Sequence, residues 1–183
     1  MKAVLTLLMF VLTTSLTWSQ ADTVFIKYNK EKFEEKPHYK TDTVIFETPN
    51  ARQLLYGTTI LPWTSSQQMA KNFGLAFQRV SNTGCKQTGK PTVNEIVSIA
   101  ETDTTLSIEL KIWGNCCHSF LCDLEIVDNS IVNLKYYGYG ATYCDCDCCY
   151  GLTYTFEKWD FKEYKLLKGV MINGDKQTMK KFK

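Results

Sequence analysis

The segment from Tyr143 to Gly151 reads YCDCDCCYG and places four cysteines within six residues. Cysteines at this density are typical of metal sites, redox sites or disulfide cross-links. The whole chain of 183 residues carries an even set of eight: Cys85, Cys116, Cys117, Cys122, Cys144, Cys146, Cys148 and Cys149. Which chemistry they serve depends on the compartment, because disulfides persist where the surroundings are oxidising.

The beginning of the chain indicates export. After Met-Lys comes a mostly apolar run of ten residues, AVLTLLMFVL (3–12), and then a polar stretch with small residues at Thr17 and Ser19. These features are typical of a secretory signal peptide, which we predict over 1–19. The run is about half the roughly 20 residues that a membrane-spanning helix needs, so we expect no transmembrane segment. The mature chain, 20–183, is expected to be secreted or periplasmic.

In an exported chain, an even set of cysteines normally forms disulfides. Cysteines two apart on a strand lie at the edge of bridging distance and aim in parallel, and adjacent ones point to opposite faces. The four cysteines of 144–149 therefore need partners elsewhere, and the rest of the chain holds four. We expect each late cysteine to bridge to one early cysteine, without the sequence selecting the individual pairs.

A metal site is the alternative use of the same residues. On an extended segment, every second residue of 144–148 projects to one face. A further ligand from the earlier cluster at 116–118 would complete a thiolate-rich tetrahedral zinc site. The C-x-C-x-C-C spacing differs from the C-x2-4-C of ordinary structural zinc sites, so disulfides without a cofactor are favoured. The ligands of the alternative site are Cys144, Cys146, Cys148 and His118.

Catalysis has little support in the sequence. The cysteines lie among strand residues instead of at a helix start, and aspartates between them would raise a thiol pKa. The only histidines are His38 and His118, and no G-x-S-x-G or H-E-x-x-H motif is present. Paired carboxylates for glycoside cleavage leave no sequence signature, because their separation is spatial. We therefore assign no catalytic residue and lean towards a protein that is not an enzyme.

Strand signals dominate the remainder of the chain. Runs of alternating or β-branched residues begin with TVFIKY at 23–28 and TVIFET at 43–48. The later runs are LAFQRV, NEIVSIAE, TLSIELKIW, FLCDLEIV, IVNLKYYGYG, YGLTYTFEKW and YKLLKGVMI. Hairpins are expected at 101–105, 128–130 and 173–174. The pattern predicts an all-β fold, namely an antiparallel β-sandwich or barrel cross-linked by disulfides.

One short helix interrupts this pattern at SSQQMAKNFG. Ser65 is the expected N-cap with Gln68 three residues later, and Gly74 is the expected stop. We expect the helix to close one end of the stacked sheets. No linker rich in proline, glycine or serine divides 20–183, so a single β-rich domain is predicted.

The net charge of +2 gives no basis for binding nucleic acid or an anionic membrane. Aromatic residues are abundant in the last third of the chain, where most are expected to fill the core. Tyr137 and Tyr139 share one face of a predicted strand, so a solvent-facing pair there could stack on a sugar or a peptide.

The runs WGNCCHSFLCDLEI and YCDCDCCYGLTYTFE together resemble the paired cysteine segments of uncharacterised exported bacterial proteins. In those, a C-C segment precedes a C-x-C-x-C segment that ends in an aromatic residue and L-x-Y. The resemblance covers Trp113 to Glu157 and, with less specificity, GCKQTGKP at 84–91. It implies a cell-envelope or secreted β domain without known activity, and it carries over no catalytic or binding residue.

These observations favour an exported, non-enzymatic binding or envelope-associated module with a protein or a glycan as its ligand. The first alternative is a secreted metal-binding protein that uses the cysteine clusters. The second is a glycan-binding or glycan-active protein that uses the aromatic strands.

Overall fold

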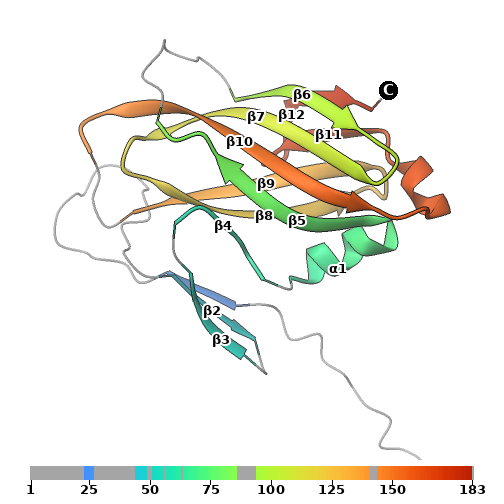
Figure 1. The fold of residues 1–183 in the computed structure, drawn as a ribbon. Helices are drawn as coiled ribbons and strands as arrows, with labels where there is room; N and C mark the ends of the chain where they lie inside the picture. Colours follow the sequence, from blue (N-terminus) through green and yellow to red (C-terminus); the bar gives the residue numbers. More distant parts are fainter. Residues whose placement is uncertain are drawn as a thin grey trace, which may run out of the picture.

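The computed structural model describes residues 23–26, 44–48, 51–55, 57–62, 64–85, 94–140 and 144–182. The predicted signal peptide and His38 lie outside these residues. The described strands form three sheets, and two of them stack face to face as a sandwich (Figure 1). The all-β prediction is confirmed, and the two stacked sheets do not close into a barrel.

The first sheet of the sandwich has four strands, and every pairing in it is antiparallel. Its strands, in spatial order, are β5 (Leu75–Asn82), β10 (Asp147–Lys158), β7 (Thr105–Asn115) and β6 (Glu95–Glu101). The central pair is in register over eleven positions from Asp147 opposite Asn115 to Glu157 opposite Thr105. This long ladder fixes the position of the cysteines at the start of β10.

The second sheet has five strands and is mixed. In spatial order they are β12 (Asp175–Lys181), β11 (Gly169–Ile172), β9 (Ile131–Tyr139), β8 (Ser119–Val127) and β4 (Thr59–Ile60). β11 runs parallel to β9, and β4 runs parallel to β8. Both pairings depart from the antiparallel prediction. β11 is parallel to β9 because the segment after β10 crosses to the second sheet and enters beside the start of β9. Part of the predicted strand YKLLKGVMI is instead the 3-10 helix η1 (Lys162–Leu166).

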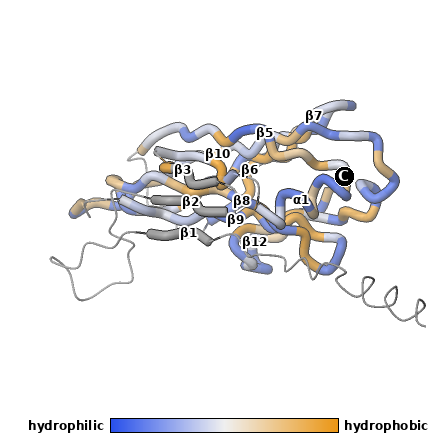
Figure 2. Tube along the Cα trace, turned by 90° about the horizontal axis from the view of Figure 1, so that it is seen from below, coloured by the Kyte–Doolittle hydropathy of each residue, from blue (hydrophilic) through white to orange (hydrophobic). Residues whose placement is uncertain are grey.

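The core lies between the two sheets. Side chains alternate along each strand, so every second residue of β7 and β10 is buried against the opposite sheet. Figure 2 shows the apolar and polar stretches that alternate along the strands of the sandwich. The largest fully buried side chains include Tyr154, Phe120, Phe156, Leu110 and Leu134.

A third sheet comprises β1 (Thr23–Ile26), β2 (Val44–Thr48) and β3 (Ala51–Leu55), all antiparallel. The predicted runs at 23–28 and 43–48 thus contain strands. Leu55 at the end of β3 packs with Leu61, Leu121 and Tyr139 in a separate small cluster. This cluster lies on the outer face of the five-stranded sheet, because the neighbouring residues Phe120 and Cys122 belong to the core.

The predicted hairpins at 101–105, 128–130 and 173–174 are present between consecutive strands. Both residues of Asp128-Asn129 have φ of 50°, and Asn173-Gly174 has φ of 47° and 76°. Two consecutive residues with positive φ are the geometry of type I′ hairpin turns, which asparagine, aspartate and glycine favour.

The predicted helix is α1 (Ser65–Asn72). Its N-cap is Thr64 instead of Ser65, because the Thr64 hydroxyl accepts a hydrogen bond from the Gln67 amide at 3.2 Å. Gly74 follows the helix with φ of 75°, as expected for a stop. α1 packs on β8 and β5 and so covers one open edge of the sandwich (Figure 1).

Candidate functional site

Three disulfides join the early cysteines to the late ones. They are Cys85–Cys148, Cys116–Cys146 and Cys117–Cys144, with Cα–Cα distances of 5.3, 5.7 and 5.6 Å. These distances lie in the usual range for disulfides. For six of the eight cysteines, the prediction of early-to-late pairing is confirmed.

The prediction of a fourth bridge is wrong, because Cys122 and Cys149 are buried and unpaired. Cys148 points into the core from β10, so the adjacent Cys149 points to the outer face of the same strand. Cys122 points into the core from β8 in the other sheet. The four-stranded sheet therefore lies between the two thiols. Burial raises the pKa of Cys122 to about 12, which keeps this thiol protonated and unreactive.

The cysteines of the alternative metal site are not brought together as a set. Cys148 faces the core and is bonded to Cys85, whereas Cys144 and Cys146 precede β10 and bond to the earlier cluster. The sulfur atoms of Cys116, Cys117 and Cys144 instead lie within 4.8 Å of one another. The predicted ligand His118 lies against β9, since a Cβ placed on Gly138 would be 2.8 Å from His118 Nδ1.

We call Cys116, Cys117, Cys144 and Cys146 the cysteine cluster. Its backbone is organised by Asn115, whose side chain is 3% exposed. Asn115 Nδ2 donates to the carbonyl oxygens of Cys144 and Cys146, and Asn115 Oδ1 accepts from the amides of Cys117 and Cys144. The Cys116 amide also donates to Cys146 O at 3.1 Å. One buried amide therefore joins both segments of the cluster, a role that no sequence pattern indicated.

The two tyrosines proposed for ligand stacking differ in exposure. Tyr137 is 38% exposed, whereas Tyr139 is 5% exposed and packs under Leu55 and Leu61. The Tyr139 hydroxyl donates to Gly57 O at 2.6 Å. The ring of Tyr139 is therefore covered by the connection between β3 and β4 and is not available to a ligand.

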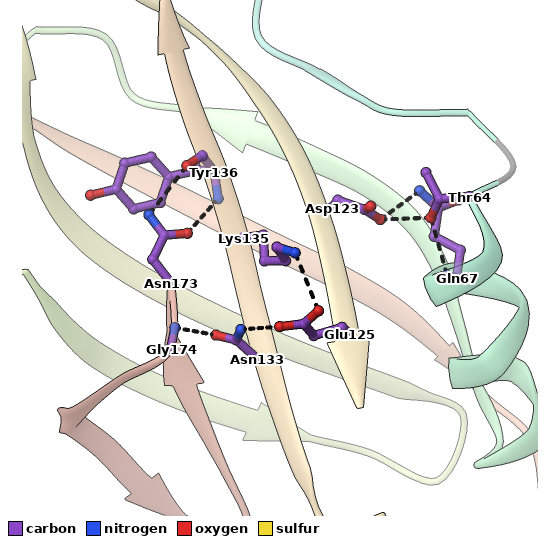
Figure 3. Close-up of polar contacts among 9 residues, drawn as sticks. All are labelled: Thr64, Gln67, Asp123, Glu125, Asn133, Lys135, Tyr136, Asn173 and Gly174. Atoms are coloured by element: carbon purple, nitrogen blue, oxygen red, sulfur yellow. Dashed lines mark hydrogen bonds and ion pairs between the residues drawn. The ribbon is translucent and has the colours of Figure 1, made fainter. Parts of the chain in front are cut away.

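A row of polar side chains crosses the outer face of the five-stranded sheet (Figure 3). Glu125 accepts hydrogen bonds from Asn133 Nδ2 at 2.7 Å and Lys135 Nζ at 3.2 Å. Burial is the largest single effect on Lys135 and lowers its pKa, but the hydrogen bonds and charge interactions with Glu125 and Tyr137 together outweigh burial, so the pKa is raised. Asn133 Oδ1 accepts from the Gly174 amide at 2.8 Å, so this row also holds the last hairpin.

At the other end of the row, the Asp123 carboxylate is 8% exposed and accepts from Thr64 Oγ1 and Gln67 Nε2, both at 3.0 Å (Figure 3). Burial raises the pKa of Asp123, and these donors partly counter the shift. Because Thr64 and Gln67 belong to the first turn of α1, Asp123 fixes the helix to β8. Gln67 also donates a short hydrogen bond to Leu61 O.

A cavity of about 360 Å³ opens where α1 meets β5. Its aromatic lining is Trp159 and Phe77, and the Phe77 ring stacks on Tyr154 and Phe156 of the core with centroids 5.3 and 5.1 Å apart. The remaining described lining residues are Ile60, Pro62, Gln67, Lys71, Ala76 and Gln78. Together with Trp159, the lining comes from four separate segments, so no local sequence signal marks this cavity.

The two glutamines of the cavity have a fixed orientation. Gln67 Nε2 faces the oxygens of Leu61 and Asp123, and Gln78 Nε2 donates to Glu157 Oε2 at 3.0 Å. These partners can only accept, so each amide nitrogen is committed to the protein. The amide oxygens are the atoms through which the two side chains can accept from a ligand.

Within the described residues, no helix is both long enough and apolar enough to cross a membrane. Neither a family model, nor a curated protein, nor a solved structure matches this chain. The likeness to paired cysteine segments of exported bacterial proteins therefore remains a likeness of motifs.

Proposed function

We propose that the protein is an exported, non-enzymatic binding domain that recognises a saccharide in the cavity between α1 and β5. The three disulfides support an oxidising compartment for this domain. A rigid sandwich with a helix-covered edge is a suitable support, because preformed sites are usually concave and mostly apolar with a few placed polar groups.

The composition of the cavity carries the proposal. Its volume of about 360 Å³ falls in the range of ligand sites. The rings of Trp159 and Phe77 offer apolar contact area, and the amide oxygens of Gln67 and Gln78 offer acceptors. A ligand that matches must combine an apolar C–H face with hydroxyl donors. Sugars have this combination.

Binding is favoured over turnover by the same lining. The described lining residues include no carboxylate, imidazole or thiol. Glycoside hydrolysis needs two carboxyl groups on either side of the scissile bond. Two carboxylates bind lining glutamines, Asp123 to Gln67 and Glu157 to Gln78, but neither is among the described lining residues. Asp123 also accepts from Thr64 and serves to hold α1.

Affinity electrophoresis tests the proposal with soluble xylan, mannan, mixed-linkage β-glucan and solubilised peptidoglycan as probes. At least one probe should retard the wild-type protein. Trp159→Ala should weaken that retardation roughly 10- to 100-fold, the equivalent of losing about 1.5 to 3 kcal/mol of aromatic burial. Gln78→Ala, on the exposed rim, should weaken it to a smaller degree because it removes one acceptor.

Tyr137→Ala is the matched control, because it removes an exposed aromatic residue from a sheet face outside the cavity lining. Retardation lost in Tyr137→Ala and kept in Trp159→Ala would move the site to the sheet face. Retardation by none of the four probes would contradict saccharide binding.

A further inference from the structure

The cysteine cluster has the sulfur arrangement of a metal site. Sγ atoms of Cys116, Cys117 and Cys144 lie within 4.8 Å of one another, and Cys146 joins them through its bond to Cys116. In a tetrahedral zinc thiolate with Zn–S near 2.3 Å, neighbouring sulfurs are about 3.8 Å apart. Opening the two bridges and moving the sulfurs by about 1 Å would produce that tetrahedron.

The cluster is also held by hydrogen bonds that do not involve its sulfur atoms. Asn115 binds the backbone of Cys117, Cys144 and Cys146 through four hydrogen bonds. The Tyr150 hydroxyl in turn donates to Asn115 O at 2.8 Å. The ladder from Asp147 opposite Asn115 continues into the sandwich. None of these contacts involves a sulfur atom, so we expect them to keep the four thiols close together after reduction.

The cluster is also accessible. Cys117 and Cys146 are exposed, and Cys116 and Cys144 are partly exposed. Asp145 and Asp147 beside them are exposed and add negative charge at the entrance, which attracts cations. By contrast, Cys122 and Cys149 are buried on strands of the sandwich and are not part of the cluster.

We propose that the cysteine cluster is a reduction-dependent site for one zinc ion or a similarly thiophilic cation. Each of the two bridges first takes up two electrons and two protons from a dithiol or phosphine donor, which becomes a disulfide or, with water, a phosphine oxide. Zn²⁺ then displaces four protons and is held by Cys116, Cys117, Cys144 and Cys146. In the oxidised protein the same sulfurs bond to each other and bind no metal.

The test uses the mature protein reduced with a phosphine and titrated with Co²⁺, followed by Zn²⁺ competition. Reduced wild-type protein should take up one Co²⁺ and develop thiolate charge-transfer and tetrahedral ligand-field bands, which Zn²⁺ abolishes. Unreduced protein should show neither. Replacing a residue that only hydrogen-bonds to a metal ligand typically weakens metal binding roughly 10- to 100-fold. Cys117→Ser/Cys144→Ser removes two ligands and should weaken binding by more than that.

Cys85→Ser/Cys148→Ser is the matched control, because it removes one bridge outside the cluster and should keep the bands. Near-ultraviolet circular dichroism of each reduced protein, with and without Zn²⁺, reports the fold independently. Reduced wild-type protein that shows no bands and gains no native signal on Zn²⁺ addition would overturn the proposal. Binding of equal strength by Cys117→Ser/Cys144→Ser, or by its single exposed variant Cys117→Ser, would overturn it as well.

Discussion

The two ends of β10 are held in different ways. At its start, disulfides join Cys146 to Cys116 and Cys148 to Cys85, and the buried Asn115 side chain donates to Cys146 O. At its far end, Lys158 forms a short ion pair with Glu101, and the Trp159 amide donates to Gly74 O at 2.9 Å.

The difference follows from the local backbone. The far end meets a tight hairpin between β6 and β7, where neighbouring strands bring hydrogen-bond partners together. At the start, the pairing with β5 ends at Leu152 opposite Asn82, so residues 147–151 of β10 pair with a strand on the β7 side alone. Covalent links stabilise the end where β10 has a paired strand on one side alone.

Loss of the longest cross-link should have the largest effect. Cys85→Ala/Cys148→Ala opens a bridge with a sequence separation of 63 residues. The chain-entropy relation predicts a loss of about 4 kcal/mol in the free energy of unfolding. Urea denaturation of the oxidised proteins measures it. Cys117→Ala/Cys144→Ala, with a separation of 27, should lose about 3.5 kcal/mol. A larger loss from the shorter bridge would contradict this ranking.

A smaller effect is expected at the far end from Gly74→Ala. Gly74 has φ of 75°, and an added Cβ would lie 2.7 Å from Trp159 O. The left-handed backbone conformation that alanine would have to adopt and the steric contact with Trp159 O should together lower the free energy of unfolding by about 2 to 4 kcal/mol.

Gly174→Ala separates the two contributions, because Gly174 has φ of 76° and nothing within 4 Å of an added Cβ. Gly174→Ala should lower the free energy of unfolding by about 1 kcal/mol, from the backbone conformation alone. Equal losses in the two glycine variants would show that the backbone of Trp159 yields to the new methyl group.

The ion pair at the far end should contribute less. The hydrogen bond from Lys158 holds the pKa of Glu101 below its ordinary value of 4.5. A lowered native pKa stabilises the fold above pH 4.5, and that contribution is lost as the pH falls through the native pKa. Because the Glu101 side chain is 36% exposed, Glu101→Gln should cost less than about 1 kcal/mol at neutral pH.

The free energy of unfolding of the wild type and of Glu101→Gln, measured between about pH 3 and pH 7, checks this prediction. That span covers roughly the range in which carboxylates titrate. The difference between the two proteins should be constant near neutrality and should close in acid. A difference that grows in acid would contradict the assigned sign.

The smallest expected effect is on native thiol reactivity. Cys122 and Cys149 are buried, so a thiol reagent should modify neither in the folded, unreduced protein. After unfolding without reductant, it should modify both and no other cysteine. Four free thiols under those conditions would mean that one of the three bridges is absent.

Much of the fold follows from short-range signals in the sequence. The hairpins at 128–130 and 173–174 were predictable because asparagine and aspartate tolerate positive φ. The early-to-late disulfide pattern was predictable because cysteines so close along a strand cannot bridge one another. The helix was placed within one residue at its N-cap, where Thr64 and Ser65 compete with similar side chains.

Other features depend on contacts between distant segments. The parallel pairing of β11 with β9 joins Gly169 to Ile131, and no local pattern encodes that choice. The isolation of Cys122 from Cys149 depends on which face of each strand meets the core. The cavity at Trp159 combines residues from four segments, so only the folded chain reveals it.

The disulfide pattern also affects the order of events during synthesis. Every bridge pairs an early cysteine with one at 144–148, so no native bridge can form before the second member has emerged. Cys144 follows Cys117 by 27 residues, which is about 1 to 5 s at ordinary elongation rates. During that delay Cys85, Cys116 and Cys117 are without their final partners, and Cys122 is a further thiol with which they can mispair. The growing chain is therefore exposed to mispairing until its last third is made, and enzymes that reshuffle disulfides should increase its yield.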